Sequence, residues 1–453
     1  MKTKITRVLQ VGDIHLPEWP SKTTDIDIKD GNFSKEIIGE LTQDRLSQVL
    51  KALNKVANSG SVDAVALMGD YTSRGDIKFI RPAVQIMRAI LRDDSNERQP
   101  LVFGVPGNHD VAKETAAIGG PIVKFDPIQQ AFKEFGFLEL PVEDCIVHQI
   151  SAEHDVRLPV YLLNSSIGSM SMHLLPKPLS DEFTDDKLGQ EAIELVGKEP
   201  VVAAEPAFGH PYSQSSNRLH QLYKQLDTPY FSKTALDTLL DQLDKEQSSF
   251  AFLCAHHNLL PQRVPRISPY SEMLNAGLVR SHLLGSGKNI VYLHGHIHEG
   301  PVEQVVRTTE HGTERPNRQL LCISAPPIWE GFNEVAFFHQ EDGEVFLVRL
   351  IEYRPDENGR IGNYSDQRAT FFPLIADNRT LLTRNARKLW DRLRDSKRLN
   401  WREAVDECGS LHINEDELEH LLLLLFCAGV VELVNLGKPR AKWRIVAMEG
   451  LGG

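Results

Sequence analysis

The sequence has 453 residues, of which 41% are hydrophobic and 25% are charged, values typical of a globular protein in water. This length exceeds that of one compact domain, so we expect two domains. The net charge of −12 argues against a chain built mainly to coat nucleic acid, although a local basic groove is compatible with it.

The five cysteines are scattered along the chain and form no Cys-x-x-Cys pair. This spacing argues against a zinc ribbon or a disulfide framework, and it favours a reducing compartment. The longest apolar run, Leu421 to Gly429, is far too short to span a bilayer, and the first residues lack the apolar run of a signal peptide. We therefore expect a cytoplasmic protein with no membrane partner.

The first quarter of the chain alternates predicted strands with predicted helices. Helical spacing of apolar residues predicts helices over 41–57 and 79–91. Three apolar runs predict buried strands, and polar side chains follow each of them, where open α/β sheets bind ligands. Asp13 and His15 follow the run at 8–12, Asp70 follows the run at 63–67, and Asn108, His109 and Asp110 follow the run at 101–105.

A further strand is predicted at 160–163. Residues 167–230 then interrupt the alternation of predicted strands and helices, because they contain six prolines and an acidic run. We interpret this segment as an insertion over the core that could act as a cap. Four of its side chains could face a substrate, although surface or packing roles are commoner for such residues. They are His173, His210, Tyr212 and His220.

Two more predicted strands end in histidines, at 250–255 and 289–293, after a capped helix predicted at 232–243. His256 and His257 follow the first of these strands, and His294, His296 and His298 follow the second. Antiparallel strands with hairpin turns are predicted next, with Asp342-Gly343 marking one turn. These strands are 319–323, 334–339 and 344–353.

The pattern changes near residue 375, which predicts a boundary between domains at 1–375 and 376–453. Three short helices and a two-stranded hairpin in the second domain resemble a winged helix. The helices are 380–394, 401–408 and 415–428, and the strands are 430–434 and 443–446.

The charges of this second domain support two different kinds of partner. Its first helix is basic (Arg384, Arg387, Lys388, Arg392, Arg394), as is its hairpin (Lys438, Arg440, Lys442, Arg444). The helix that would enter a DNA groove begins with four carboxylates, which would repel phosphates. They are Glu415, Asp416, Glu417 and Glu419. We therefore favour contact with a protein partner or with the cap, and the basic hairpin keeps nucleic acid open.

The polar residues at the five strand ends share one chemistry. Carboxylate, imidazole and amide donors without a thiolate suit Mn²⁺, Fe or Zn²⁺, and disfavour a structural zinc site built on cysteine. There are too many donors for one ion. Two divalent ions about 3.5–4 Å apart, bridged by a carboxylate and a hydroxide, would use them all and would suit in-line displacement at phosphorus.

These blocks resemble the calcineurin-like metallophosphoesterase superfamily over roughly residues 5–350. The matching motifs are Asp13-x-His15, Gly69-Asp70, Gly107-Asn108-His109-Asp110, His256 and Gly295-His296-x-His298. The resemblance implies an α/β protein with a four-layer α/β/β/α sandwich and a dinuclear metal site at the strand ends. It implies that one metal is held by Asp13, His15 and His298, and the other by Asn108, His256 and His296, with Asp70 as the bridge. His256 is chosen because it comes first after its strand, and His257 is the fallback.

The resemblance also implies roles for residues that are not ligands. His109 would lie beside the leaving oxygen as a proton donor or transition-state stabiliser, with Asp110 orienting it. The nucleophile would be the bridging hydroxide. Gly-Asp-Tyr-Thr-Ser-Arg-Gly resembles a block of the Ser/Thr protein phosphatases whose arginine binds substrate phosphate, which suggests that role for Arg74 over that of a solvated loop residue.

Other features match a different branch of the superfamily. Asp110 replaces a glutamate of the protein phosphatases, and Leu16 replaces a glycine. These changes and the pair His256-His257 look more like the cyclic-nucleotide and glycerophosphodiester phosphodiesterases. We expect a phosphoesterase acting on nucleotides or other small phosphodiesters, with phosphomonoesters as further substrates. A DNA or RNA nuclease is the alternative, and a non-catalytic scaffold is disfavoured because every ligand block is intact.

Overall fold

The computed structural model describes most of the chain, and the secondary structure and contacts given below refer to that part. The described residues are 3–16, 45–73, 75, 77–92, 98–112, 122–151, 156–169, 228–261, 272–298, 300–307, 318–340, 342–356, 360–362, 367–374, 383–409 and 411–448. Arg74, most of the expected insertion with its four candidate side chains, and the expected boundary at 375 lie outside them.

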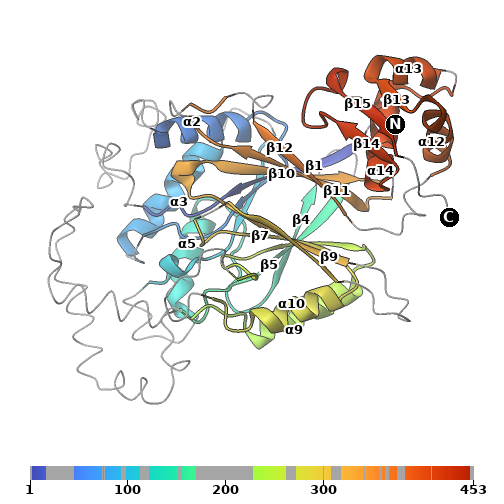
Figure 1. The fold of residues 1–453 in the computed structure, drawn as a ribbon. Coiled ribbons are helices and arrows are strands. Elements are labelled where there is room, and N and C mark those ends of the chain that lie inside the picture. Colours follow the sequence, from blue (N-terminus) through green and yellow to red (C-terminus); the bar gives the residue numbers. More distant parts are fainter. Residues whose placement is uncertain are drawn as a thin grey trace, which may run out of the picture.

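Two six-stranded sheets form the centre of the molecule (Figure 1). The first has the order β12-β11-β10-β1-β2-β3, in which β1, β2 and β3 are parallel and the others pair antiparallel. Its strands are β1 (Lys4–Val11), β2 (Ala64–Leu67), β3 (Leu101–Gly104), β10 (Phe332–His339), β11 (Val345–Tyr353) and β12 (Arg368–Pro373).

The second sheet has the order β4-β5-β6-β7-β9-β8, with β5, β6, β7 and β9 parallel. Its strands are β4 (Ile146–Ser151), β5 (Arg157–Leu162), β6 (Phe250–Cys254), β7 (Asn289–His294), β8 (Val302–Arg307) and β9 (Arg318–Ser324). The strand expected at 319–323 is β9, and it does not lie in the same sheet as the strands expected at 334–339 and 344–353. β9 pairs with β7 and β8, and the chain crosses to the other sheet before β10, which does form the expected hairpin with β11.

Helices cover the outer face of each sheet, which gives four layers, as expected. Alternating residues of one strand point to opposite layers: Val8 and Ala64 enter the core between the sheets, whereas Leu9 and Val65 face the helices. The first sheet is covered by α2 (Arg45–Ala57), α3 (Ile77–Leu91) and α5 (Asp126–Glu134), and the second by α9 (Lys233–Lys245) and α10 (Ala276–Gly285). No described helix combines the length and apolar character needed to cross a membrane.

The last part of the chain forms a unit of three helices and a three-stranded antiparallel sheet (Figure 1). The expected helices and strands are present, and a short strand that pairs with the last one joins them. The elements are α12 (Arg384–Ser396), β13 (Arg398–Asn400), α13 (Trp401–Gly409), α14 (Glu415–Cys427), β14 (Val431–Val434) and β15 (Arg444–Ala447). The likeness to a winged helix stays a prediction.

This C-terminal unit packs on one end of the first sheet. Its hydrophobic core includes Phe338 and Phe346 from β10 and β11, with Ile5 at its edge. Ile5 pairs with Phe338 near the start of β1, whereas the polar residues of interest follow Val11 at its end. Six residues of strand separate the two positions, about 20 Å. The C-terminal unit and the strand-end residues therefore lie at opposite ends of β1.

Candidate metal centre

Side chains from the ends of β1, β2 and β7 form a first group of four donors: Asp13, His15, Asp70 and His298. His298 Nε2 lies 3.4 Å from Asp13 Oδ1, and His15 Nε2 lies 3.8 Å from Asp70 Oδ2. The Nε2 atoms of His15 and His298 are 3.0 Å apart. The first three side chains are buried and His298 is 39% exposed, so this group opens to solvent at one side.

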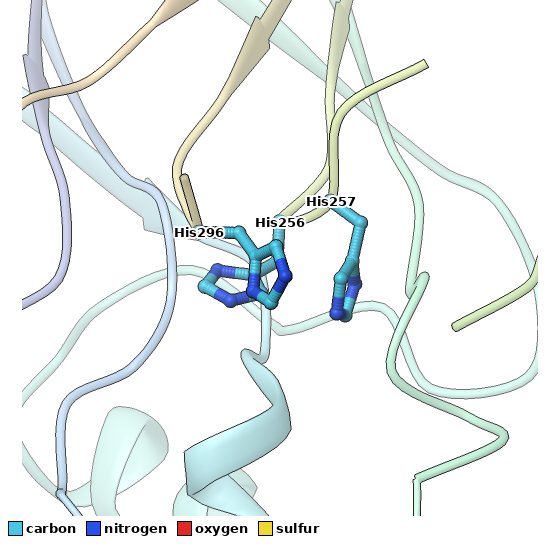
Figure 2. A group of neighbouring side chains, drawn as sticks. All are labelled: His256, His257 and His296. Carbon is cyan, nitrogen blue, oxygen red and sulfur yellow. The ribbon is translucent and has the colours of Figure 1, made fainter. Parts of the chain in front are cut away.

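A second group consists of three buried histidines, His256, His257 and His296, from the ends of β6 and β7 (Figure 2). Their rings hang from the strand ends toward the same region. One ligand atom from each lies within 4.8 Å of the others. Asn108, in the turn after β3, joins them, because its Oδ1 is 3.0 Å from His256 Nε2.

Asp70 connects the two groups. Its Oδ2 lies 3.8 Å from His15 Nε2 in the first group and 3.3 Å from His256 Nε2 in the second. Its other oxygen, Oδ1, accepts a hydrogen bond from the backbone N–H of His109 at 2.9 Å, which fixes the carboxylate plane. One carboxylate thus faces donors from both sets.

The carboxylates give this region a strong negative potential. Burial disfavours a charged imidazole, yet the Asp70 carboxylate outweighs burial and raises the pKa of His256 to about 10. Burial would likewise raise the pKa of Asp70, but His256 and His109 lower it well below its usual range. The same potential that favours a proton on His256 would favour a divalent cation in its place.

Five of the expected ligands have a left-handed backbone. Positive φ angles, between 49° and 70°, occur at Asp13, His15, Asp70, His296 and His298. Only three other non-glycine residues of the described chain share this conformation. Such strain persists where the surrounding structure enforces it, and it concentrates at functional sites. The turns after β1, β2 and β7 therefore bend their side chains into one region.

The backbone at Gly107 lies too close to Asp70 to carry a side chain. A Cβ atom at Gly107 would lie 2.1 Å from Asp70 Oδ1, so only glycine fits there. The turns after β1 and β2 also pair with each other, since His15 N–H donates to the carbonyl oxygen of Asp70 at 2.8 Å. These contacts hold the two carboxyl-bearing turns in fixed register.

Two observations show that the donors fit metal ions. His256 Nδ1 donates to the carbonyl oxygen of Met68 at 2.6 Å, so a neutral ring presents a bare Nε2. That Nε2 lies 3.0 Å from Asn108 Oδ1 and 3.3 Å from Asp70 Oδ2, where a cation could take the place of the proton. Asp13 Oδ2 is buried and has no hydrogen-bond partner. Oxygen and imidazole nitrogen donors that converge on one region, and a buried carboxylate oxygen without a partner, suit cations.

The position of Asp110 differs from the expectation that it orients the His109 ring. Its carboxylate accepts four backbone N–H groups, from Asp70, Tyr71, Thr72 and Gly107, at 2.7 to 3.2 Å. These donors occupy both oxygens, which leaves the carboxylate no capacity for the ring. Asp110 instead holds the backbone of the turn that carries Asp70.

His109 is oriented by Ser73. The Nδ1–H of its ring donates to the Ser73 carbonyl oxygen, since a carbonyl can only accept. The half-buried ring lies edge-on to His15, with ring centroids 5.2 Å apart. Its Nε2 is therefore the nitrogen that can face a substrate beside the first group.

Two residues near these groups escaped the sequence predictions. Ser165 follows β5, and its Oγ lies 2.8 Å from His257 Nδ1. The polar run after the predicted strand at 160–163 was a usable signal. Trp329 lies between β9 and β10, with its ring 5.9 Å from that of His15 and 6.1 Å from that of His298. No local pattern in the sequence marks it.

The family model for calcineurin-like phosphoesterases matches residues 6–300. The chain belongs to this family. No curated protein sequence matches the chain significantly. As a calcineurin-like phosphoesterase, the protein is a metal-dependent hydrolase that acts on phosphoester bonds, and the structure holds two groups of carboxylate and imidazole side chains that could bind metal ions.

Solved structures with a similar fold include several phosphatases and nucleotidases. One is a dimetal phosphatase from Danio rerio, at 11% identity and a TM-score of 0.40, over 77% of this chain and 96% of that one. PhoD matches at 8% identity and a TM-score of 0.42, over 83% and 71% of the chains. A putative 5'-nucleotidase from Staphylococcus aureus matches at 12% and 0.38, over 86% and 59%. These distant matches add nothing to the assignment, which rests on the family model.

Proposed function

We propose that this calcineurin-like phosphoesterase hydrolyses phosphodiester bonds in nucleotides or similar small molecules. The observation that carries the proposal is the position of Asp70, whose Oδ2 faces His15 on one side and His256 on the other. A carboxylate between two donor sets is what a pair of cations at catalytic distance requires.

The side chains would divide between two divalent ions, for which Mn²⁺ is our first choice and Fe or Zn²⁺ the alternatives. Asp13, His15 and His298 would hold one ion, and Asn108, His256 and His296 the other, with Asp70 shared. When bound, the ions would supply a water of lowered pKa and offset the charge that develops on the phosphoryl oxygens.

The chain itself would supply the proton for the leaving group. Because Ser73 fixes Nδ1–H of His109, a protonated ring presents Nε2–H to a substrate beside His15. This is the placement that a general acid needs. Asp110 would act through the backbone, by holding Asp70 and its neighbours in place. Arg74 remains our candidate for binding the substrate phosphate.

Trp329 supports a small substrate with a planar group. Its partly buried ring stands next to His15 and to the exposed His298, at the open side of the first donor group. An aromatic face in this position could stack on a nucleobase or an aryl ester.

The C-terminal unit favours the small substrate over the nuclease alternative. Its core packs on the start of β1, about 20 Å along the strand from the donors. Arg440 of its hairpin forms ion pairs with Glu415, Asp416 and Glu419, which offset one of the hairpin's four positive charges. We propose that residues 376–453 form a winged-helix-like domain for a protein partner.

The free thiols support a location in the cytoplasm. All five cysteines are unpaired, and four of them are buried. Burial raises the pKa of Cys145 to about 12 and that of Cys254 well above its usual value, so these thiols are inert structural groups. We propose a reducing compartment on this basis.

One panel of assays tests the function. The full chain with Mn²⁺ is assayed on bis-p-nitrophenyl phosphate, p-nitrophenyl phosphate, cyclic nucleotides, and single- and double-stranded DNA and RNA. We expect turnover of the small diesters, lowered more than about 100-fold in Asp70→Asn. Hydrolysis of nucleic acid alone would select the nuclease, and no hydrolysis of any substrate would refute the proposal.

A further inference from the structure

His257 is a buried histidine with an unused ring nitrogen. It is 1% exposed and directly follows His256, the residue that we assign to the second ion. His257 itself has no role in the proposed dinuclear centre. Its Nε2 is buried and has no hydrogen-bond partner, although buried polar atoms are nearly always paired.

The surroundings of His257 hold the ring in one orientation. Ser165 Oγ lies 2.8 Å from Nδ1 and also accepts the backbone N–H of His257 at 3.0 Å. The hydroxyl of Tyr292 donates to the carbonyl oxygen of His257 at 2.6 Å. Backbone and ring are thus fixed by buried neighbours, and Nε2 is the nitrogen left for another group.

The ring of His257 lies within the second donor group. One nitrogen each from His256, His257 and His296 lie within 4.8 Å of one another (Figure 2). The ring centroids of His257 and His296 are 4.3 Å apart, closer than the 5.2 Å between His256 and His296. The His257 ring is therefore at least as close to His296 as the His256 ring is.

We propose that His257 Nε2 is a further ligand of the second ion, alongside His256 and His296. This ion would then have three imidazoles, Asn108 and the shared Asp70, whereas the first has two carboxylates and two imidazoles. Imidazole-rich sites favour Zn²⁺ or Fe²⁺, and carboxylate-rich sites accept Mn²⁺. The inference rests on the proposed dinuclear centre, and it assigns the two positions different metal preferences.

Matched variants separate a ligand from a structural residue. His257→Asn keeps an amide near the position of Nδ1, for the bond to Ser165, and removes Nε2. His257→Gln places an amide oxygen near the position of Nε2. His257→Ala removes both contacts. His282→Asn changes an exposed histidine on α10 and serves as the control.

The test is a Zn²⁺ titration of the metal-free full chain by calorimetry, with metal content after dialysis as a second readout. We expect two sites in wild type and in His282→Asn. In His257→Asn one site should weaken at least tenfold while the other is unchanged, and His257→Gln should recover part of the loss. With Co²⁺, the visible band of His257→Asn should move to longer wavelength, because water oxygens split the d orbitals less than imidazole does.

Two outcomes overturn the inference. One is two Zn²⁺ constants in His257→Asn within twofold of wild type. The other is a loss in His257→Ala that His257→Asn fully restores, which would show that the residue acts only through Ser165. Melting temperatures of the metal-free variants identify misfolding. If wild type binds two Zn²⁺ ions but hydrolyses no substrate, the proposed function fails and the ligand inference stands.

Discussion

The Asp110 carboxylate accepts the backbone N–H of Asp70 at 2.8 Å, so that one acidic residue holds the main chain of another. Its two oxygens each meet two N–H donors. Burial and the charge on Asp70 raise the pKa of Asp110, and the bonds from Gly107 and Thr72 counteract that rise. The geometry of Asp70 therefore depends on a side chain that belongs to neither donor group.

Asp110→Asn should destabilise the protein. The amide nitrogen would have to face two N–H donors, which leaves buried donors unpaired at a cost of about 1–3 kcal/mol. We expect a lower free energy of unfolding in denaturant, and weaker metal binding because the Asp70 turn shifts. Wild-type stability with wild-type metal affinity would contradict this role, and Asp356→Asn, on a loop in contact with solvent, is a suitable control.

His109→Ala should lower kcat and leave metal content unchanged. A general acid contributes about 10²- to 10⁴-fold, and the loss depends on how much the leaving oxygen needs a proton. We expect a large loss on an alkyl phosphodiester and a much smaller loss on bis-p-nitrophenyl phosphate, whose leaving group is stable as an anion. Equal losses on both substrates would assign His109 to transition-state charge instead of proton transfer.

Trp329→Ala should raise KM for substrates that carry a ring. Aromatic stacking contributes about 0.5–1.5 kcal/mol, which corresponds to a rise of roughly two- to tenfold. Trp329→Phe should retain most of the affinity, and a glycerophosphodiester without a ring should show little change in either variant. An equal rise in KM for all of these substrates would indicate that Trp329 only supports His15 and His298.

His420 should make stability depend on pH. It is buried between α14 and β11 with its ring against Phe346, and burial lowers its pKa to about 4 from an ordinary 6.5. Between pH 6.5 and 4 the His420 side chain is protonated in the unfolded chain and neutral in the folded chain. The free energy of unfolding is therefore highest above pH 6.5 and falls as the pH drops toward 4. From pH 7 to 5 this loss is on the order of 2 kcal/mol.

Denaturant unfolding of the metal-free protein at pH 7 and pH 5 measures this effect. His420→Leu should lose less stability between the two pH values than wild type does, and the exposed control His282→Leu should match wild type. The same pH dependence in wild type and His420→Leu would exclude His420 as its source.

Much of the site follows from one regularity in the sequence. Parallel strands end at the same edge of a sheet, so polar residues after the runs at 8–12 and 63–67 were predicted to meet. His15 and Asp70 do meet, with Nε2 of the first 3.8 Å from Oδ2 of the second. The alternation of buried strands with amphipathic helices predicted an α/β protein, whereas the four layers were implied by the resemblance to the metallophosphoesterases.

The parts that were not predictable depend on contacts between distant segments. Strand β9 has the apolar pattern of any buried strand, and that pattern does not say which sheet it joins. The role of Asp110 depends on four backbone N–H groups, which no side-chain motif reports. β13 has only three residues, Arg398–Asn400, and its pairing with β15 is what defines it as a strand. Trp329 reaches the donors because the chain crosses between the sheets there.

The left-handed turns at five donors tie metal affinity to the stability of the whole sandwich. Each such residue costs about 1–3 kcal/mol, so together they consume an amount comparable to the net stability of a typical domain. The packed sheets must supply that energy to keep the donors converged. A cavity made far away, between the two sheets, would therefore weaken ion binding while the protein is still folded.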